Sequence, residues 1–238
     1  MLSNEVVRYN NIMNEIGFRK FTPVEFDLFF SLCAKMKRLG TESVVFTFEE
    51  LKELVNYSSR DRNRFILDLT TTYAKMLSLN LRYENESELV QFVLFTKFRI
   101  DKNNDSVEVK VNDEFSFILN EITTNFTRYE LKDFTYLKSG YSKTMYRLIM
   151  QFKSTGFYKV TVDEFRRLLD IPEVYKISHI DQKILTPIKR ELTPLFDYFE
   201  IKKIKKKGRG RGGVVSHFEF YFKEKKNLKV PLHNWAKD

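Results

Sequence analysis

The chain has very little of the residue types that build disulfide frameworks, metal centres and nucleophilic active sites. It contains one cysteine and three histidines among 238 residues. The single cysteine, Cys33, excludes a disulfide within the chain and a cysteine-based zinc site, and its place in the apolar run FDLFFSLCA favours a buried small side chain. The histidines are scattered, with no HxH or HExxH spacing to hold a metal: His179, His217 and His233.

Long apolar runs and nucleotide-binding glycine motifs are also missing. No segment approaches the ~18 consecutive apolar residues of a membrane-spanning helix, and MLSNEVVRYNN at the start has no apolar signal segment. There is no GxxxxGK[ST] motif, and the clustered glycines of GRGRGG, 208–213, lack the strand-loop-helix context of a phosphate-binding loop. We therefore expect a cytoplasmic protein with no enzymatic activity, no cofactor and no membrane contact.

What the sequence does contain is basic charge concentrated in one half. Residues 1–125 carry 16 lysines and arginines against 19 acidic residues, and residues 126–238 carry 25 against 13, giving net charges of −3 and +12. A basic half favours a polyanion as its partner. An acidic neighbour suggests a second module with another task, such as pairing with a partner protein.

One phrase occurs twice in the chain. FTFEELKELV at 46–55 and VTVDEFRRLL at 160–169 both read apolar-Thr-apolar-acid-Glu-apolar-basic-x-Leu-apolar. A threonine followed three residues later by glutamate is a capping box, which begins a helix by satisfying its free backbone N–H groups. Thr22 and Glu25 repeat the device around a proline at the first helical position.

The order of expected elements is duplicated as well. In the first half the apolar periodicity predicts three helices and then a β-hairpin, at 22–38, 48–56, 60–80, 90–100 and 106–112. In the second half it predicts three helices and a hairpin closed by GRGRGG, with the helices at 141–153, 162–169 and 178–192. Three helices and a β wing, twice, indicate an α+β fold of tandem winged-helix domains. We place these domains at 1–124 and 125–226, followed by a tail at 227–238.

The helix expected at 178–192 is the best candidate for reading DNA. In a helix-turn-helix the second helix enters the major groove, where every base pair presents its own pattern of donors and acceptors. The face opposite the apolar stripe carries side chains suited to bases or phosphates: Ser178, His179, Gln182, Lys183, Thr186, Lys189 and Arg190. Solvation of an ordinary helix surface is the alternative. Pro187 removes a backbone hydrogen bond, so the last turn could aim differently from the first.

The turn of the second hairpin supports a polyanionic partner. Like charges crowded into KKIKKKGRGRGG repel one another unless a polyanion is present. We expect this wing to lie on phosphates or in the minor groove through Lys205, Lys206, Lys207, Arg209 and Arg211. A solvated basic loop, or an import-like signal, is the alternative.

The first half offers fewer groups that could read DNA. Arg60, Arg62 and Arg64 stand near the start of its long helix and suit phosphate contacts, but the residues after them are poor in base-reading side chains.

The first hairpin is apolar on both faces. Within six residues it carries four large apolar side chains: Val90, Phe92, Leu94 and Phe95. Such a strand needs cover on both sides. The domain's own core and a second subunit, hence a dimer interface, are both open readings.

Several motifs of the second half occur together in a known family. Residues 125–211, with LKSGYSKTMYRL, FRRLLDIPEVY and ILTPIKREL before a GR-rich turn, resemble the second winged-helix domain of the iteron-binding replication initiators of theta-replicating bacterial plasmids. RKFTPVEFDLFFSLCAKM and VQFVLFTKFRI extend the likeness to the first half. Arg190-Glu191-Leu192 departs from the family, where many relatives end this helix with an acid, an apolar residue and asparagine.

The resemblance implies an initiator that binds directly repeated origin sites in double-stranded DNA as a monomer. The basic domain would read the major groove and the first domain would grip the neighbouring backbone, with Lys138 and Lys143 touching phosphate near a helix start. The same protein would repress its own promoter as a homodimer paired through the first domain, and would recruit the host initiator DnaA and the replicative helicase without a catalytic step. The alternative is a transcriptional repressor, from a phage or plasmid, with no replication role.

Overall fold

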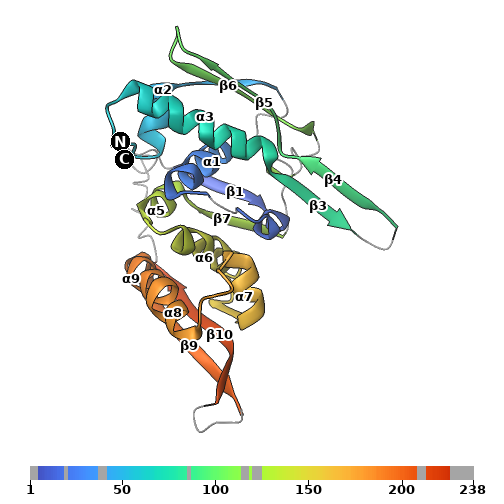
Figure 1. Ribbon diagram of the computed structural model, residues 1–238, viewed down its shortest axis with the longest axis vertical. Coiled ribbons are helices and arrows are strands. Elements are labelled where there is room, and N and C mark those ends of the chain that lie inside the picture. Colours follow the sequence, from blue (N-terminus) through green and yellow to red (C-terminus); the bar gives the residue numbers. More distant parts are fainter. Residues whose placement is uncertain are drawn as a thin grey trace, which may run out of the picture.

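The structure, a computed structural model, describes residues 5–18, 21–36, 42–84, 87–113, 118–119, 125–207 and 213–225. Two winged-helix domains, each of mixed helices and strands, are stacked along the long axis of the molecule (Figure 1). Among the described residues, no helix is both long and apolar enough to cross a membrane.

In the first domain, one buried helix supports a helix-turn-helix and a three-stranded sheet. The helices are α1 (Pro23–Met36), α2 (Phe48–Leu54) and α3 (Arg62–Ser78). The sheet has the order β2-β6-β5 and contains β2 (Val44–Thr47), β5 (Phe95–Asp101) and β6 (Ser106–Val111). Aromatic rings fill the core. The ring centroid of Phe30 in α1 lies 4.9 Å from the ring centroids of both Phe29 and Phe134.

The second domain repeats this arrangement. Its helices are α6 (Gly140–Met150), α7 (Val162–Leu169), α8 (Ile177–Ile180) and α9 (Thr186–Leu192). Its sheet, of order β8-β10-β9, contains β8 (Phe157–Thr161), β9 (Phe196–Lys206) and β10 (Val214–Glu224). The two sheets place corresponding strands in corresponding positions, which confirms the duplication that the repeated phrase indicated.

The repeated phrase does the same work in both copies, at the junction of a strand and a helix. Thr47 forms a complete capping box with Glu50, whose N–H donates to the threonine hydroxyl while its carboxylate accepts from the threonine N–H. In the second copy Thr161 accepts from the N–H of Glu164 at 3.1 Å, but the Glu164 carboxylate turns to Arg167 instead. The second box is therefore only half formed, because an arginine one turn along offers that carboxylate a charged partner.

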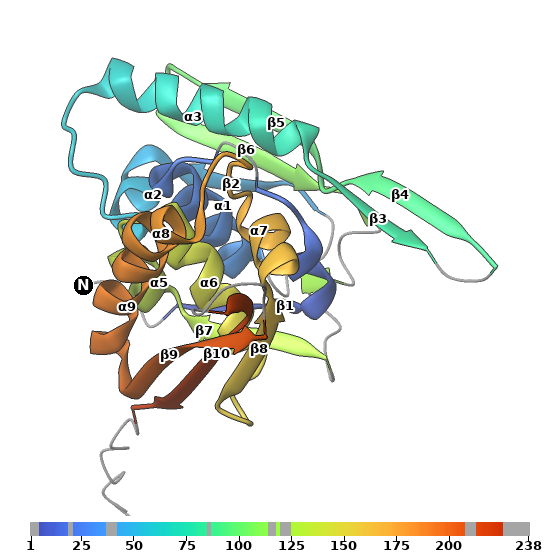
Figure 2. The same cartoon turned by 60° about the horizontal axis from the view of Figure 1, so that its bottom comes forward.

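The hairpin predicted at 90–100 and 106–112 is wrong in part. The apolar stretch divides at Leu94 into β4 (Leu89–Val93), which pairs with β3 (Asn80–Glu84), and β5, which pairs with β6. The strands β3 and β4 form a separate two-stranded ribbon that projects from the body of the molecule (Figures 1 and 2). The described wing of the first domain is therefore shorter than the apolar pattern suggested.

A second two-stranded ribbon joins distant parts of the chain. β1 (Val6–Asn10) pairs antiparallel with β7 (Phe126–Glu130), and α5 (Leu131–Tyr136) follows directly. A short 3-10 helix, η1 (Asn11–Glu15), leaves β1. The ribbon spans the boundary that we set at residue 124, and that boundary stays a prediction.

Candidate nucleic-acid interface

The predicted reading face of the second domain is presented to solvent. Ile177–Leu192, here called the recognition helix, packs its apolar stripe inward, with Ile180, Ile184 and Ile188 fully buried. Six of the seven side chains predicted to read DNA are exposed: Ser178, Gln182, Lys183, Thr186, Lys189 and Arg190. The last part of this helix, α9, lies beside β9 (Figures 1 and 2).

Proline reshapes the middle of the recognition helix without breaking it. Between α8 and α9 lies a single π-helical turn, η2 (Asp181–Leu185), in which the Thr186 N–H donates to the Asp181 carbonyl five residues earlier. The Thr186 hydroxyl donates to the same carbonyl at 2.8 Å. Pro187 has no N–H to donate to the regular hydrogen-bond ladder, and the π turn lies just before it. The helix therefore continues past Pro187, and Lys189 and Arg190 of its last turn are exposed.

His179 differs from its neighbours on the reading face. It is half-buried, and its Nδ1 accepts a hydrogen bond of 3.2 Å from the Lys176 N–H at the start of the helix. The ring also lies edge-on against Tyr175, 5.7 Å between centroids. Since Nδ1 is occupied in starting the helix, only Nε2 is left to meet a base.

The basic wing runs alongside the recognition helix. Lys203 of β9 reaches Asp181 of the recognition helix at 2.7 Å, which ties the two elements together. Lys205 and Lys206 are exposed further along the strand, and Lys207 is exposed just after its end. The two other predicted wing residues, Arg209 and Arg211, lie outside the described residues.

The helix start expected to bind phosphate holds a carboxylate of the chain itself. Glu191, near the end of the recognition helix, accepts the backbone N–H groups of Lys138 and Ser139 at 2.9 and 3.0 Å, where α6 begins. Lys138 is exposed beside this contact. Its side chain remains a candidate for phosphate binding, whereas the backbone N–H groups are already occupied.

Lys143 was predicted to touch phosphate, and the structure contradicts this. Its side chain is fully buried, and its ammonium donates to Asp27 Oδ1 at 2.6 Å and to the Phe134 carbonyl at 2.8 Å. Burial raises the pKa of Asp27 to about 7, although the Lys143 charge opposes the rise, and burial lowers the pKa of Lys143. The lysine joins α6 to α1 inside the protein and cannot reach DNA.

In the first domain, two of the three predicted phosphate-binding arginines already have acidic partners. Arg60, Arg62 and Arg64 are all exposed. Arg62 pairs with Asp105 of the β5–β6 turn at 2.6 Å, and the Arg64 Nε lies 3.3 Å from Asp68. DNA phosphates would compete with these carboxylates for the arginines. We therefore expect the first domain to bind DNA more weakly than the second.

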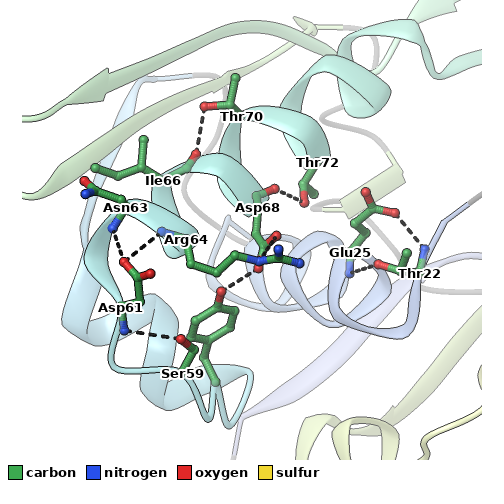
Figure 3. Close-up of polar contacts among 11 residues, drawn as sticks. Thr22, Glu25, Ser59, Asp61, Asn63, Arg64, Ile66, Asp68, Thr70 and Thr72 are labelled. Carbon is green, nitrogen blue, oxygen red and sulfur yellow. Dashed lines mark hydrogen bonds and ion pairs between the residues drawn. The ribbon is translucent and has the colours of Figure 1, made fainter.

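The start of α3 is well ordered by local hydrogen bonds. Asp61 accepts the N–H groups of Asn63 and Arg64 as the N-cap of the helix, and its own N–H donates to Ser59 (Figure 3). The figure also shows Arg64 lying along the helix toward Asp68. Arg62 and Arg64 lie in the first turn after this cap and are exposed, which suits contacts with the DNA backbone.

The four residues predicted for dimerisation divide into two groups. Leu94 and Phe95 are buried in the first domain, at 0% and 1% exposure, so the core reading is correct for them and the interface reading is wrong. Val90 and Phe92 are half-buried on the projecting ribbon, and Phe92 packs in part against the core. Leu89 and Val93, which we did not single out, are 51% and 40% exposed on the same strand.

Comparison with known families agrees with this architecture. The family model described as "Initiator Replication protein, WH1" matches residues 6–150, and the one described as "Initiator Rep protein, WH2" matches residues 161–222. The chain belongs to this initiator family.

Individual relatives of this initiator chain were found by sequence and by structure. A "Probable replication protein rep" of Bifidobacterium longum (strain NCC 2705) is 38% identical over 197 residues, which are 82% of the chain and 66% of that relative. The crystal structure of Pi initiator protein in complex with iteron DNA superposes with a TM-score of 0.72 at 13% identity, covering 94% of the chain and 99% of Pi. At that identity the match establishes the shared fold.

Proposed function

We propose that the protein is a plasmid replication initiator that binds directly repeated origin sites as a monomer. The exposed face of the recognition helix beside a lysine-rich wing carries this proposal. Gln182 suits adenine and Lys183 suits guanine in the major groove, and lysines beside them suit phosphate. The family match and the likeness of the fold to a protein crystallised with iteron DNA support the same reading.

The two domains would divide the work on DNA. The second domain has the reading face and the basic strand β9, whereas the first offers Arg60, Arg62 and Arg64 at the start of α3. We propose that the second domain selects the sequence and the first holds the neighbouring backbone. Arg62 and Arg64 are already paired with acidic side chains, which fits a smaller contribution of the first domain to DNA affinity.

A homodimer that represses its own promoter is the second part of the proposal. β3 and β4 form a two-stranded sheet, so both strands have a free edge within the described part of the chain. A free edge with apolar side chains is a surface on which another strand can pair. We propose self-association through this ribbon, with Val90 and Phe92 in the interface. Recruitment of DnaA and the replicative helicase belongs to the same proposal and rests on the family alone.

Footprinting on the DNA upstream of the gene, with monomer and dimer fractions separated by size, tests the proposal. Protection of several helically phased direct repeats by monomer, and of an inverted repeat by dimer, is the expected result. Protection of a lone palindrome would replace the initiator with a transcriptional repressor. Absence of any sequence-dependent protection would overturn both.

A further inference from the structure

The recognition helix ends on a buried carboxylate that faces the protein. Glu191 is one-tenth exposed, while its neighbour Arg190 is 73% exposed on the reading side. One Glu191 oxygen accepts both N–H groups at the start of α6, and the other lies 3.3 Å from an Arg190 nitrogen. The side chain therefore joins the last turn of the recognition helix to the N-cap of a different helix, α6.

The surroundings of Glu191 stabilise the ionised form of its carboxyl group. Burial alone would raise the pKa of the carboxyl, but the N–H groups of Ser139 and Lys138 and the neighbouring Arg190 outweigh it, so the pKa lies below its usual value. A carboxylate at a helix N-terminus is also stabilised by the helix dipole. Hydrogen bonds to an ionised acceptor are stronger than neutral ones, so the contact is a firm anchor.

The helix to which Glu191 is anchored is itself fixed to the first domain. One turn into α6, Lys143 forms the buried contact with Asp27 of α1. A chain of direct contacts thus runs from α1 through the first turn of α6 to the end of the recognition helix. The recognition helix contains a π turn, which interrupts its regular hydrogen-bond ladder. The direction of its last turn therefore depends on the contact that Glu191 makes with the start of α6.

We propose that Glu191 is a positioning residue for DNA reading: by holding the end of the recognition helix on the start of α6, it sets the angle at which the helix meets the major groove. The inference rests on the proposed function. Base contacts depend on this angle, because a side chain must meet a base edge within hydrogen-bonding geometry. Phosphate contacts made by flexible lysines depend on it much less.

The test measures the ratio of specific to non-specific affinity. The wild-type protein first selects its preferred duplex from a random pool, and that duplex and a scrambled one are then titrated with wild type, Glu191→Gln and Asp197→Asn across a range of salt concentrations. Asp197 is an exposed acid of the same domain, so its variant makes the same change in net charge away from the anchor. We expect Glu191→Gln to lose about tenfold in the ratio, as when one base contact is misaligned, while Asp197→Asn leaves it unchanged.

Three other outcomes separate the alternatives. An unchanged ratio in folded Glu191→Gln would overturn the proposal. Tighter binding to both duplexes with a steeper salt dependence than in Asp197→Asn would show that the carboxylate competes with a phosphate for the α6 N-terminus, which also overturns it. Failure of the wild type to enrich any duplex would remove the proposed function instead.

Two further measurements keep the test decisive if Glu191→Gln is unstable. Glu191→Asp retains the charge on a shorter side chain, and we expect it to recover part of the ratio. Amide hydrogen exchange at Lys138 and Ser139 should accelerate in Glu191→Gln without DNA present. Unchanged exchange there would show that the anchor does not exist in solution.

Discussion

At the scale of single residues, Lys143 of α6 and Asp27 of α1 form a buried ion pair. Asp27 lies inside the apolar run FDLFF, and Lys143 stands four residues before Arg147 on the buried side of α6. Both charged groups are buried, so each serves as the counter-charge of the other.

Removing one partner of this pair should cost far more than removing both. Asp27→Leu leaves the Lys143 ammonium buried without its counter-charge, and we expect the free energy of unfolding to fall by about 3–5 kcal/mol. The double variant Asp27→Leu/Lys143→Met replaces the pair with apolar side chains and should regain most of that loss. Guanidinium chloride unfolding of wild type, single and double variants measures both. A double variant as unstable as the single one would contradict a coupled pair.

The Glu191 anchor predicts a specific pH dependence of stability. Its pKa is lower in the folded protein than in the unfolded chain, so its contribution is complete above about pH 4.3. That contribution is lost as the pH falls through the lower, folded value. We therefore expect wild type to be more stable than Glu191→Gln at neutral pH and the two to converge in acid, as measured by thermal unfolding from pH 7 down to pH 3. A difference that does not shrink as the pH falls would place the effect on shape and not on charge.

At the scale of elements, helices were easier to foresee than strand breaks. The start of α7 was predicted from its threonine and its apolar period, and it begins at Val162 as expected. The sequence does not indicate that the apolar stretch divides into two strands at Leu94, because no glycine, proline or asparagine stands there. The π turn had a visible cause in Pro187, but the sequence alone does not distinguish a π turn from a kink.

The recognition helix gives the sharpest prediction for an element. Gln182→Ala and Lys183→Ala should each weaken binding to the specific site by about 1–3 kcal/mol if the side chains read bases. The Lys183 ammonium lies 4.8 Å from the ring centroid of Tyr175, so this cation–π contact restrains the side chain before DNA binds. Titration of specific and scrambled duplexes separates the effects. Equal losses on both would reduce the two residues to phosphate contacts.

At the scale of the whole molecule, the sequence alone predicts the duplicated architecture and the uneven distribution of charge. Repeated caps and hairpins gave the two winged-helix domains, and the family models match each of them. The β3–β4 ribbon was not foreseen, because a pairing of β3 with β4 has no signal apart from apolar side chains that a core would explain equally well.

Self-association through that ribbon can be tested on the intact chain. Val90→Lys and Val93→Lys place a charge on the exposed strand β4, and we expect sedimentation velocity to show a shift toward monomer. The matched control is Leu67→Lys, which charges a side chain 57% exposed on α3 of the same domain. A shift of equal size in the control would indicate general loss of stability, and no shift in either ribbon variant would place the interface elsewhere.

The pairing of β1 with β7 has a consequence for how the protein is made. Val7 and Tyr9 of β1 are fully buried, and the strand that pairs with β1 is synthesised more than a hundred residues later. At about 5–20 residues per second, translation leaves this apolar strand without its partner for on the order of ten seconds. The first domain is therefore finished only when the ribosome has begun the second, so a chain cut short before Phe126 would lack a completed domain of either kind.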